Sequence, residues 1–197
     1  MAVSIEDIKR LRELTGVGMT DAKKALDESN GDFDKALEAM RKKGMTKAEK
    51  RGEREARAGI IGTYNHDSRI GVLVEVNCET DFVARNDEFQ AFVKDVALQI
   101  AASKPSYVKR EDIPAAVIEK EKDIYQAQAK EMGKPEAAWA KITEGKLERF
   151  YQESCLLEQA YIRDASVTIK DLLTQKIAKI GENIAIRRFT RYQLGIE

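Results

Sequence analysis

The sequence predicts an α+β fold, with a bundle of three short helices at the N-terminus and a core of helices packed with a small antiparallel three-stranded sheet. In residues 1–43, apolar side chains recur one helical turn apart between glycine turns, which is the period of amphipathic helices. After Gly59 the chain gives two β-branched runs, several helical stretches and a last β-branched run, an order typical of α+β domains. We therefore expect a three-helix domain in residues 1–43, a charged linker in 44–58 and an α+β core in 59–197.

The three predicted helices of the N-terminal domain each carry one apolar stripe. The first ends at Thr15-Gly16-Val17-Gly18, and Thr20 is expected to cap the second. Asn30-Gly31 ends the second helix, and Asp32 begins the third. The stripes are formed by Ile5, Ile8, Leu11, Leu14, Ala22, Ala25, Leu26, Phe33, Ala36, Leu37 and Met40. Because a bundle of this size has only a small core, we expect it to bind a partner rather than to catalyse a reaction.

Residues 41–57 carry eight basic and three acidic side chains, in a chain whose 34 Lys and Arg residues balance its 34 Asp and Glu residues. This composition is typical of a solvated, partly helical linker. The alternative interpretation is a phosphate-binding stripe, since clustered Lys and Arg attract nucleic acid. No aromatic side chain is interleaved to stack on bases, and the whole chain has no net charge, so we favour the linker.

The core begins with a predicted β-hairpin and ends with a predicted strand. β-branched runs at 60–64 and 71–78 flank the turn sequence 65–69. The side chains predicted to share one face of the second strand are Val72, Val74, Val76 and Cys78. Residues 184–192 supply the third strand, which completes the small sheet.

Four amphipathic helices are predicted between the second and the last strand. The first spans 87–103, and its apolar stripe is formed by Phe89, Phe92, Val93, Val96 and Ile100. Mostly proline and glycine delimit the other three. The residues at or near their ends are Pro114, Gly133, Pro135, Phe150, Thr168 and Gly181. Gly145 is a point at which the third of these helices could break.

The inventory of catalytic side chains argues against an enzyme. His66 is the single histidine and is expected in the exposed hairpin loop, so neither a histidine triad nor a multi-histidine metal site can form. Cys78 and Cys155 have no CxxC partner and are expected to be small buried residues. Gly16-Val17-Gly18 follows a helix and lacks a third glycine at Asp21, and GxxxxGK[ST] is absent. We therefore expect no bound nucleotide, cofactor or metal.

The N-terminus and the hydropathy pattern predict a soluble protein of the cytoplasm. The first nine residues carry acidic side chains where a signal or transit peptide would not. No apolar run approaches the roughly 18 residues that a membrane span needs. The two cysteines show no pairing pattern, as in proteins of reducing compartments. We therefore expect no association with a membrane.

An acidic and a large aromatic residue stand side by side after the second strand, in the segment 79–86. Local chemistry alone favours a structural turn, in which Thr80 is the cap and Asp81 lies at the positive end of the turn. In that interpretation Phe82 and Val83 enter the hydrophobic core.

The same segment resembles the signature of the bacterial elongation factor Ts family, in the run Asn77-Cys78-Glu79-Thr80-Asp81-Phe82-Val83-Ala84-Arg85-Asn86. Other segments are similar to further parts of that family, in order along the whole chain. These segments are residues 11–19, 21–26, 59–62, 71–75, 141–146, 156–159 and 181–189.

The resemblance implies a guanine-nucleotide exchange factor that promotes GDP release from the GTPase elongation factor Tu during translation elongation. It implies that residues 1–43 form a ubiquitin-associated-like bundle that docks on the GTPase domain. It also implies that Asp81 and Phe82 reach the partner near its Mg²⁺ site. The implied site residues are Thr80, Asp81, Phe82, Val83, Ala84, Arg85 and Asn86, with Leu11, Thr15, Gly16, Val17, Gly18 and Met19 in the N-terminal domain.

At 197 residues the chain is short for this family. Longer members carry a second core subdomain with an inserted helical hairpin, for which we expect no room here. Short members form homodimers through the sheet, so the resemblance implies a homodimer made by residues 59–197. Thr190 stands where some short members have a cysteine, so packing alone would hold the dimer.

Two other classes of function stay open. A nucleic-acid-binding protein could use the basic side chains of 41–57, which predicts a steep salt dependence of RNA or DNA affinity. A helical adaptor could use residues 1–43 to recognise a peptide or a ubiquitin-like partner. Co-purification of a GTPase-sized protein that GDP and Mg²⁺ dissociate would favour the exchange factor, for which we expect no bound nucleic acid.

Overall fold

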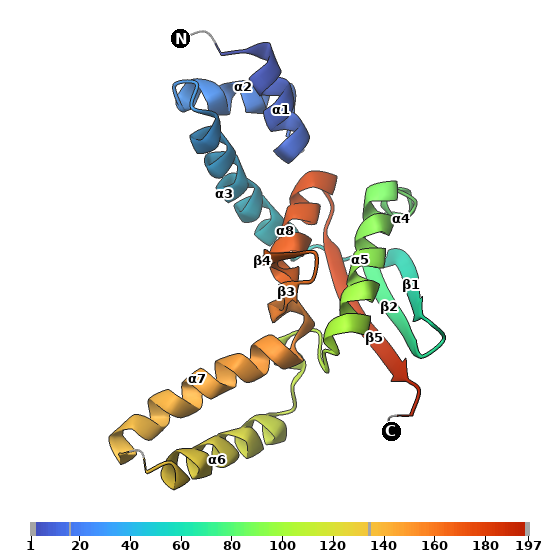
Figure 1. Ribbon diagram of the computed structural model, residues 1–197. Helices are drawn as coiled ribbons and strands as arrows, with labels where there is room; N and C mark the ends of the chain where they lie inside the picture. The colour runs from blue at the N-terminus through green and yellow to red at the C-terminus, as the bar shows by residue number, and fades with distance from the viewer. Residues whose placement is uncertain (1–2, 16, 134, 196–197) are drawn as a thin grey trace. The chain divides into compact units, whose positions relative to one another are not determined.

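The computed structural model describes residues 3–15, 17–133 and 135–195, and these form the α+β architecture that the sequence predicts (Figure 1). The α-helices are α1 (Ile5–Thr15), α2 (Met19–Glu28), α3 (Phe33–Arg51), α4 (Asp81–Ala84), α5 (Asp87–Ser103), α6 (Ala115–Glu131), α7 (Glu136–Ser154) and α8 (Ile169–Ile180). Two 3-10 helices are η1 (Arg110–Asp112) and η2 (Leu156–Glu158). The strands are β1 (Ala58–His66), β2 (Ile70–Cys78), β3 (Ala160–Tyr161), β4 (Asp164–Thr168) and β5 (Ile184–Gln193).

The chain divides into two compact units that are each assembled from separate segments. The first unit contains Met1–Gly62, Val74–Asp95 and Asp171–Arg187, and the second contains Thr63–Leu73, Val96–Lys170 and Arg188–Glu197. Within the described residues, no helix combines the length and the hydropathy that a membrane span requires.

Helices α1, α2 and α3 pack around a small apolar core, as predicted. The side chains of that core are Ile8, Leu11, Ala22, Ala25, Leu26, Ala36 and Met40. Asn30 and Gly31 adopt positive φ angles of 53° and 82°, which lets the chain turn tightly between α2 and α3. The prediction that Thr20 caps α2 is wrong, because the helix begins at Met19 after Gly18, whose position offers no side-chain cap.

Three details of this bundle go beyond the prediction. Ile5 and Leu14 of α1 are exposed at 67% and 56%, so only two positions of the expected stripe enter the core. Helix α3 continues to Arg51, and residues 44–51 of the charged segment are therefore helical. Gly16, one of the implied partner-binding residues, lies outside the described residues.

Strands β1, β2 and β5 form one antiparallel sheet in the order β1-β2-β5, so the last strand of the chain pairs with β2. The predicted face of β2 is buried throughout, at Val72, Val74, Val76 and Cys78. Helix α5 has the predicted bounds, and its whole predicted stripe is buried. Gly62 of β1 lies so close to Val93 of α5 that an added Cβ would overlap the Val93 side chain. Glycine is required there because the helix approaches the strand backbone.

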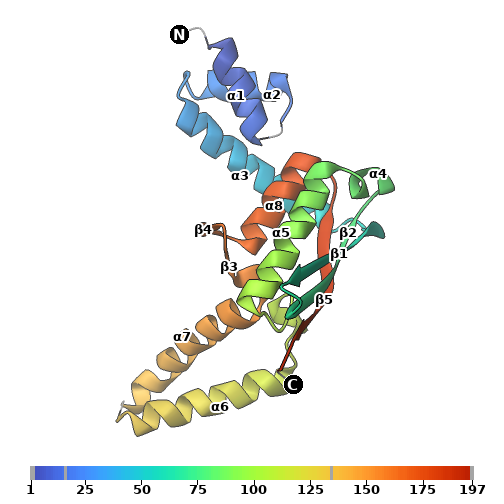
Figure 2. The same ribbon diagram turned by 45° about the vertical axis from the view of Figure 1, so that its right-hand side comes forward.

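Helices α6 and α7 lie side by side as an antiparallel pair (Figure 2). Helix α7 runs from Glu136 to Ser154 without a break at Gly145. The chain thus carries an antiparallel helical pair in residues 115–131 and 136–154, although we expected no room for the inserted helical hairpin of longer members. Arg110 supports the base of this pair, because its guanidinium bonds Glu148 and stacks over the Tyr151 ring at 4.5 Å.

The short ribbon of β3 and β4 was not predicted from the sequence. Its strands have two and five residues, which is too little chain for a clear alternating pattern. The fully buried Gln99 of α5 holds the ribbon, because its side chain donates to the Ala160 carbonyl at 3.1 Å and accepts from the Ile162 N–H at 2.9 Å. A long-range side-chain bond of this kind has no local sequence signal.

Candidate functional site

The segment between β2 and α5 presents an aromatic side chain to solvent. Helix α4 is a single turn, and Phe82 within it is 88% exposed. The local interpretation that Phe82 enters the core is therefore wrong, and Val83 is only half-buried. Fully burying a phenyl side chain contributes roughly 1.5–3 kcal/mol. That free energy is still available to a partner that covers the ring.

Hydrogen bonds within the segment cap both ends of this turn. Thr80 has an extended backbone, with φ −131°, and its Oγ1 accepts from the Val83 N–H at 3.4 Å. At the other end, the Asn86 N–H donates to the Val83 carbonyl at 2.9 Å and closes the turn. Asn86 Oδ1 accepts from the Glu88 N–H at 2.8 Å and so begins α5. Ala84 between them is 5% exposed and anchors the turn to the hydrophobic core.

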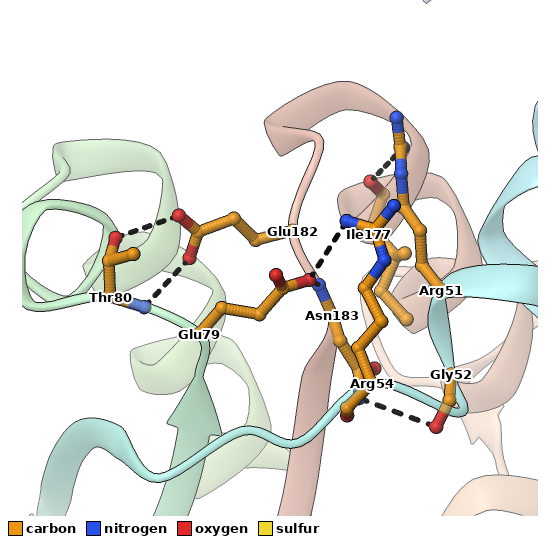
Figure 3. Close-up of polar contacts among 8 residues, drawn as sticks. All are labelled: Arg51, Gly52, Arg54, Glu79, Thr80, Ile177, Glu182 and Asn183. Carbon is orange, nitrogen blue, oxygen red and sulfur yellow. Dashed lines mark hydrogen bonds and ion pairs between the residues drawn. The ribbon is translucent and has the colours of Figure 1, made fainter.

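Residues 181–183, which we call the α8–β5 corner, hold the base of the turn (Figure 3). Glu182 accepts two hydrogen bonds from Thr80, from its N–H at 3.0 Å and from its hydroxyl at 2.7 Å. The next residue, Asn183, donates its N–H to Glu79 Oε1 at 2.6 Å. The two consecutive residues before α4 are thus bonded to the corner, Glu79 to Asn183 and Thr80 to Glu182.

Cys78 lies beneath the turn and is fully buried, as the sequence predicts. Its thiol donates to the Thr80 carbonyl oxygen at 3.2 Å. Burial, together with the negative charges of Glu182 and Asp81, raises the pKa of the Cys78 thiol to about 11. The thiol is therefore protonated at neutral pH and remains a hydrogen-bond donor to the base of the turn.

The seven implied residues of this segment differ in what their side chains can do. The side chains that are exposed and take no part in capping are Asp81, Phe82 and Arg85. Thr80 and Asn86 are engaged in the caps, whereas Val83 and Ala84 are half-buried and buried. The turn therefore exposes an apolar ring, a carboxylate and a guanidinium within five consecutive residues.

The implied site of the N-terminal domain lies where α1 meets α2. Gly18 and Met19 are exposed, and Val17 is half-buried against the bundle core. Leu11 is fully buried, and the Thr15 hydroxyl donates to its carbonyl at 2.6 Å. Leu11 and Thr15 thus support the bundle in this structure, and the role of all these residues in binding a partner stays a prediction.

The side chains considered for catalysis are exposed or structural. His66 is exposed at the end of β1, as predicted, with Nδ1 3.2 Å from the Tyr64 hydroxyl. Cys155 is fully buried, and burial together with the charge of Glu158 raises the pKa of its thiol to about 11. In the described part of the chain, no three His, Cys, Asp or Glu side chains gather as metal ligands would.

Reasoning from the sequence missed the residues that hold the base of the turn. Glu182 lies 102 residues after Thr80, and Asn183 lies 104 residues after Glu79. Periodicity and capping patterns relate residues only a few positions apart, so they cannot pair these side chains. The one sequence signal was that the corner belongs to a segment similar to the elongation factor Ts family.

Comparison with known proteins places the whole described chain in one family. The family model for Elongation factor TS matches residues 3–195. Elongation factor Ts of Thermodesulfovibrio yellowstonii is 55% identical over 195 residues, which cover 99% of this chain and 98% of the relative. Elongation factor Ts of Thermotoga maritima is 57% identical over 196 residues, which cover 99% of this chain and 98% of the relative. Elongation factor Ts of Carboxydothermus hydrogenoformans is 56% identical over 194 residues, which cover 98% of this chain and 89% of the relative.

Proposed function

The chain belongs to the elongation factor Ts family, and we propose that it promotes GDP release from elongation factor Tu by inserting Asp81 and Phe82 near the Mg²⁺ site of that GTPase. Nucleotide exchange on elongation factor Tu during translation elongation is the activity that membership of this family implies. The 88% exposure of Phe82, on a turn capped at both ends, is the observation that supports the insertion mechanism.

The chemistry of the partner explains why an aromatic ring beside an acid suits this task. A GTPase holds Mg²⁺ through the phosphates of the nucleotide, a Ser or Thr side chain and ordered waters in near-octahedral geometry. A phenyl ring wedged between two partner helices displaces the elements that position those waters. The Asp81 carboxylate competes for the hydrogen bonds that the waters use. Neither Asp81 nor Phe82 has to touch the nucleotide, and the factor itself binds none.

Exchange of this kind follows from coupling between two binding equilibria. If the factor weakens GDP binding by some ratio, GDP must weaken binding of the factor by the same ratio. The factor therefore has no preferred direction, and the excess of GTP over GDP in the cell sets the outcome. It catalyses no covalent reaction, and its place of action is the cytoplasm, where elongation takes place.

The N-terminal bundle supplies a second contact to the same GTPase. Gly18 and Met19 are the exposed residues at the junction of α1 and α2, and Met19 is 41% exposed. A flexible thioether side chain on a small rigid bundle adapts to an apolar groove on a partner. Docking by the bundle would raise the local concentration of the Phe82 turn at the Mg²⁺ site.

The second unit carries apolar side chains that support a homodimer formed through the sheet. Leu73 of β2 is 48% exposed, Tyr192 of β5 is 73% exposed and Leu194 is 70% exposed. Leu73 alternates with buried valines, so it faces away from the core of its own chain. Static light scattering at micromolar concentration should give twice the mass of one chain, and the mass of a single chain would reject the dimer.

Stimulated release of a fluorescent GDP analogue from elongation factor Tu tests the function. The native chain should accelerate release, and Phe82→Ala should fold normally but lose most of that acceleration. Circular dichroism and the urea midpoint confirm that the variant is folded, because an 88% exposed side chain contributes little to stability. An unimpaired Phe82→Ala would exclude the insertion mechanism.

A further inference from the structure

We propose that Glu182 is the positioning residue of this site, which holds Thr80 and thereby sets the direction in which Asp81 and Phe82 meet the partner. The proposal rests on the proposed function and deepens it, since it names a residue outside the signature segment on which insertion depends. Glu182 touches neither the partner's nucleotide nor its metal in this proposal, and acts only through the turn.

Helix α4 cannot hold its own orientation. It has four residues, and a single helical turn is unstable alone because its nucleation fixes several dihedral angles for few hydrogen bonds. Phe82 contributes almost no packing to its own chain, because it is 88% exposed. The direction of the ring must therefore be set by what holds the residues on either side of it.

Glu182 satisfies both donors that Thr80 offers. One carboxylate oxygen accepts from the Thr80 N–H at 3.0 Å, and the other accepts from the Thr80 hydroxyl at 2.7 Å. Because the hydroxyl hydrogen is committed to Glu182, a lone pair of Oγ1 is left for the Val83 N–H at 3.4 Å. The carboxylate thus fixes the backbone of Thr80 and also the rotation of the hydroxyl that caps α4.

The α8–β5 corner presents this carboxylate from a rigid place in the fold. Helix α8 ends at Ile180, and the next residue, Gly181, has φ +90° and donates its N–H to the Ile177 carbonyl at 3.0 Å. On the other side, Asn183 is 6% exposed, and its side-chain amide donates to the carbonyls of Gly52 at 3.4 Å and Arg54 at 2.5 Å (Figure 3). Glu182 therefore stands between two fixed residues.

Loss of Glu182 should loosen α4 without unfolding the core. The Thr80 side of the contact is exposed, so water can replace the lost hydrogen bonds. Ala84 and the buried stripe of α5 keep the segment attached. Such a region opens locally, with a free energy well below that of global unfolding. The consequence is a turn that samples many directions, which lowers the fraction able to insert.

The test compares Glu182→Ala, Glu182→Gln and Thr80→Val, alone and combined, in stimulated GDP release at increasing factor concentration. Glu182→Ala should lower the second-order rate constant of stimulated release about tenfold, the effect of losing hydrogen bonds to a charged group. Thr80→Val removes the hydroxyl bond to Glu182 and also the cap on the Val83 N–H, so it should lower the rate constant by a similar amount. The variant that combines Glu182→Ala with Thr80→Val should lose less than the sum of the two single losses, because both changes remove the same contact. Glu182→Gln should recover part of the rate.

Glu148→Ala is the matched control. Glu148 also accepts two hydrogen bonds, both from Arg110 at 2.9 Å, and it lies on α7 in the second unit. Glu148→Ala should lower the free energy of unfolding by about as much as Glu182→Ala does, and it should leave stimulated GDP release unchanged. Equal loss of release in both variants would assign the effect to general stability and would overturn the positioning role.

Hydrogen exchange in the isolated factor gives a readout that needs no partner. The Ala84 N–H donates to the Thr80 carbonyl at 3.2 Å, so its exchange reports whether the turn is closed. Glu182→Ala should accelerate exchange at Ala84 about tenfold and leave the amides of α5 protected. Unchanged exchange at Ala84, or additive losses in the combined variant, would overturn the proposal. A native chain that fails to stimulate GDP release, with accelerated exchange at Ala84, would instead refute the proposed function and with it any role of Glu182 in exchange.

Discussion

Two short connections in this chain each leave a large apolar side chain in water, and they differ in what holds them. Phe82, between β2 and α5, is 88% exposed, and Met132, at the end of α6, is 66% exposed. The bonds found at Met132 are those of a helix end, such as its N–H to the Gln128 carbonyl at 3.0 Å. The turn that carries Phe82 is instead bonded to the α8–β5 corner, which lies about a hundred residues further along the chain.

The difference shows that exposure of an apolar side chain does not by itself make a binding site. Single exposed apolar residues are ordinary on protein surfaces. A side chain that is both exposed and held in one direction loses little conformational entropy on binding, which is the advantage of preorganisation. Among the residues that the structure describes, long-range anchoring therefore distinguishes the Phe82 turn from the connection at Met132.

The largest expected effect follows directly from this contrast. Phe82→Ala should lower stimulated GDP release about a hundredfold, because losing a buried aromatic anchor at an interface costs roughly 2–4 kcal/mol. Met132→Ala, an equally mild truncation, should change release less than about twofold. The rates of stimulated GDP release of both variants are measured in the same fluorescent GDP assay. If both variants lost a comparable part of the rate, the two connections would not differ in function.

Asn183→Ala tests how much the hydrogen bonds that hold the α8–β5 corner contribute to the free energy of unfolding. The variant should lower the free energy of unfolding by about 2 kcal/mol, because the buried Asn183 amide no longer donates to the Gly52 and Arg54 carbonyls. Asn65→Ala is the control, since Asn65 accepts a local bond from the Ser68 N–H in an exposed turn. Its loss should cost under about 1 kcal/mol in urea unfolding. Equal costs would mean that the corner is no better anchored than a surface hairpin.

The base of the helical pair should respond to pH through Glu158. Hydrogen bonding to the Arg110 guanidinium holds the pKa of Glu158 below its ordinary value of 4.5. Its contribution to stability is therefore fully present above pH 4.5 and is lost as the pH falls through the lower pKa of the folded state. Between pH 5 and pH 3, the free energy of unfolding measured in urea should fall by up to about 1 kcal/mol more for the native chain than for Glu158→Gln. If the free energies of unfolding of the two proteins changed with pH in parallel, the ion pair of Glu158 would contribute nothing to stability.

The smallest effect is expected within the helical pair. Thr143 of α7 is 6% exposed, and its hydroxyl has no hydrogen-bond partner among the described residues. Thr143→Val should raise the free energy of unfolding by up to about 1 kcal/mol, because it removes an unsatisfied buried polar group and keeps the shape. Stimulated GDP release should not change. A loss of stability would show that the hydroxyl does have a partner.

Local sequence rules predicted most of the elements. The hairpin, helix α5 and strand β5 have the predicted bounds to within about two residues, because alternating β-branched residues and flanking proline or glycine are strong local signals. The β3–β4 ribbon was missed, since its position depends on the buried side chain of Gln99. The hairpin formed by α6 and α7 was excluded only by analogy with longer relatives, although both helices had been predicted from their own patterns.

The candidate site was predictable in position but not in arrangement. The run from Asn77 to Asn86 indicated the segment, and local chemistry identified Thr80 as its cap. The same local chemistry placed Phe82 in the core, because it treats an aromatic residue next to a strand as a packing residue. The exposure of that ring depends on how β2 and α5 pack, which no rule of short-range periodicity contains.

By itself the sequence determined most of the secondary structure, the α+β class and the family. These features depend on residue types, on spacings of two to four residues and on one ten-residue run. Only the tertiary structure decided that Phe82 faces solvent and that Glu182 holds the turn. The physical reason is that hydrogen bonds and burial depend on distance in space, and the residues concerned lie about a hundred positions apart in the chain.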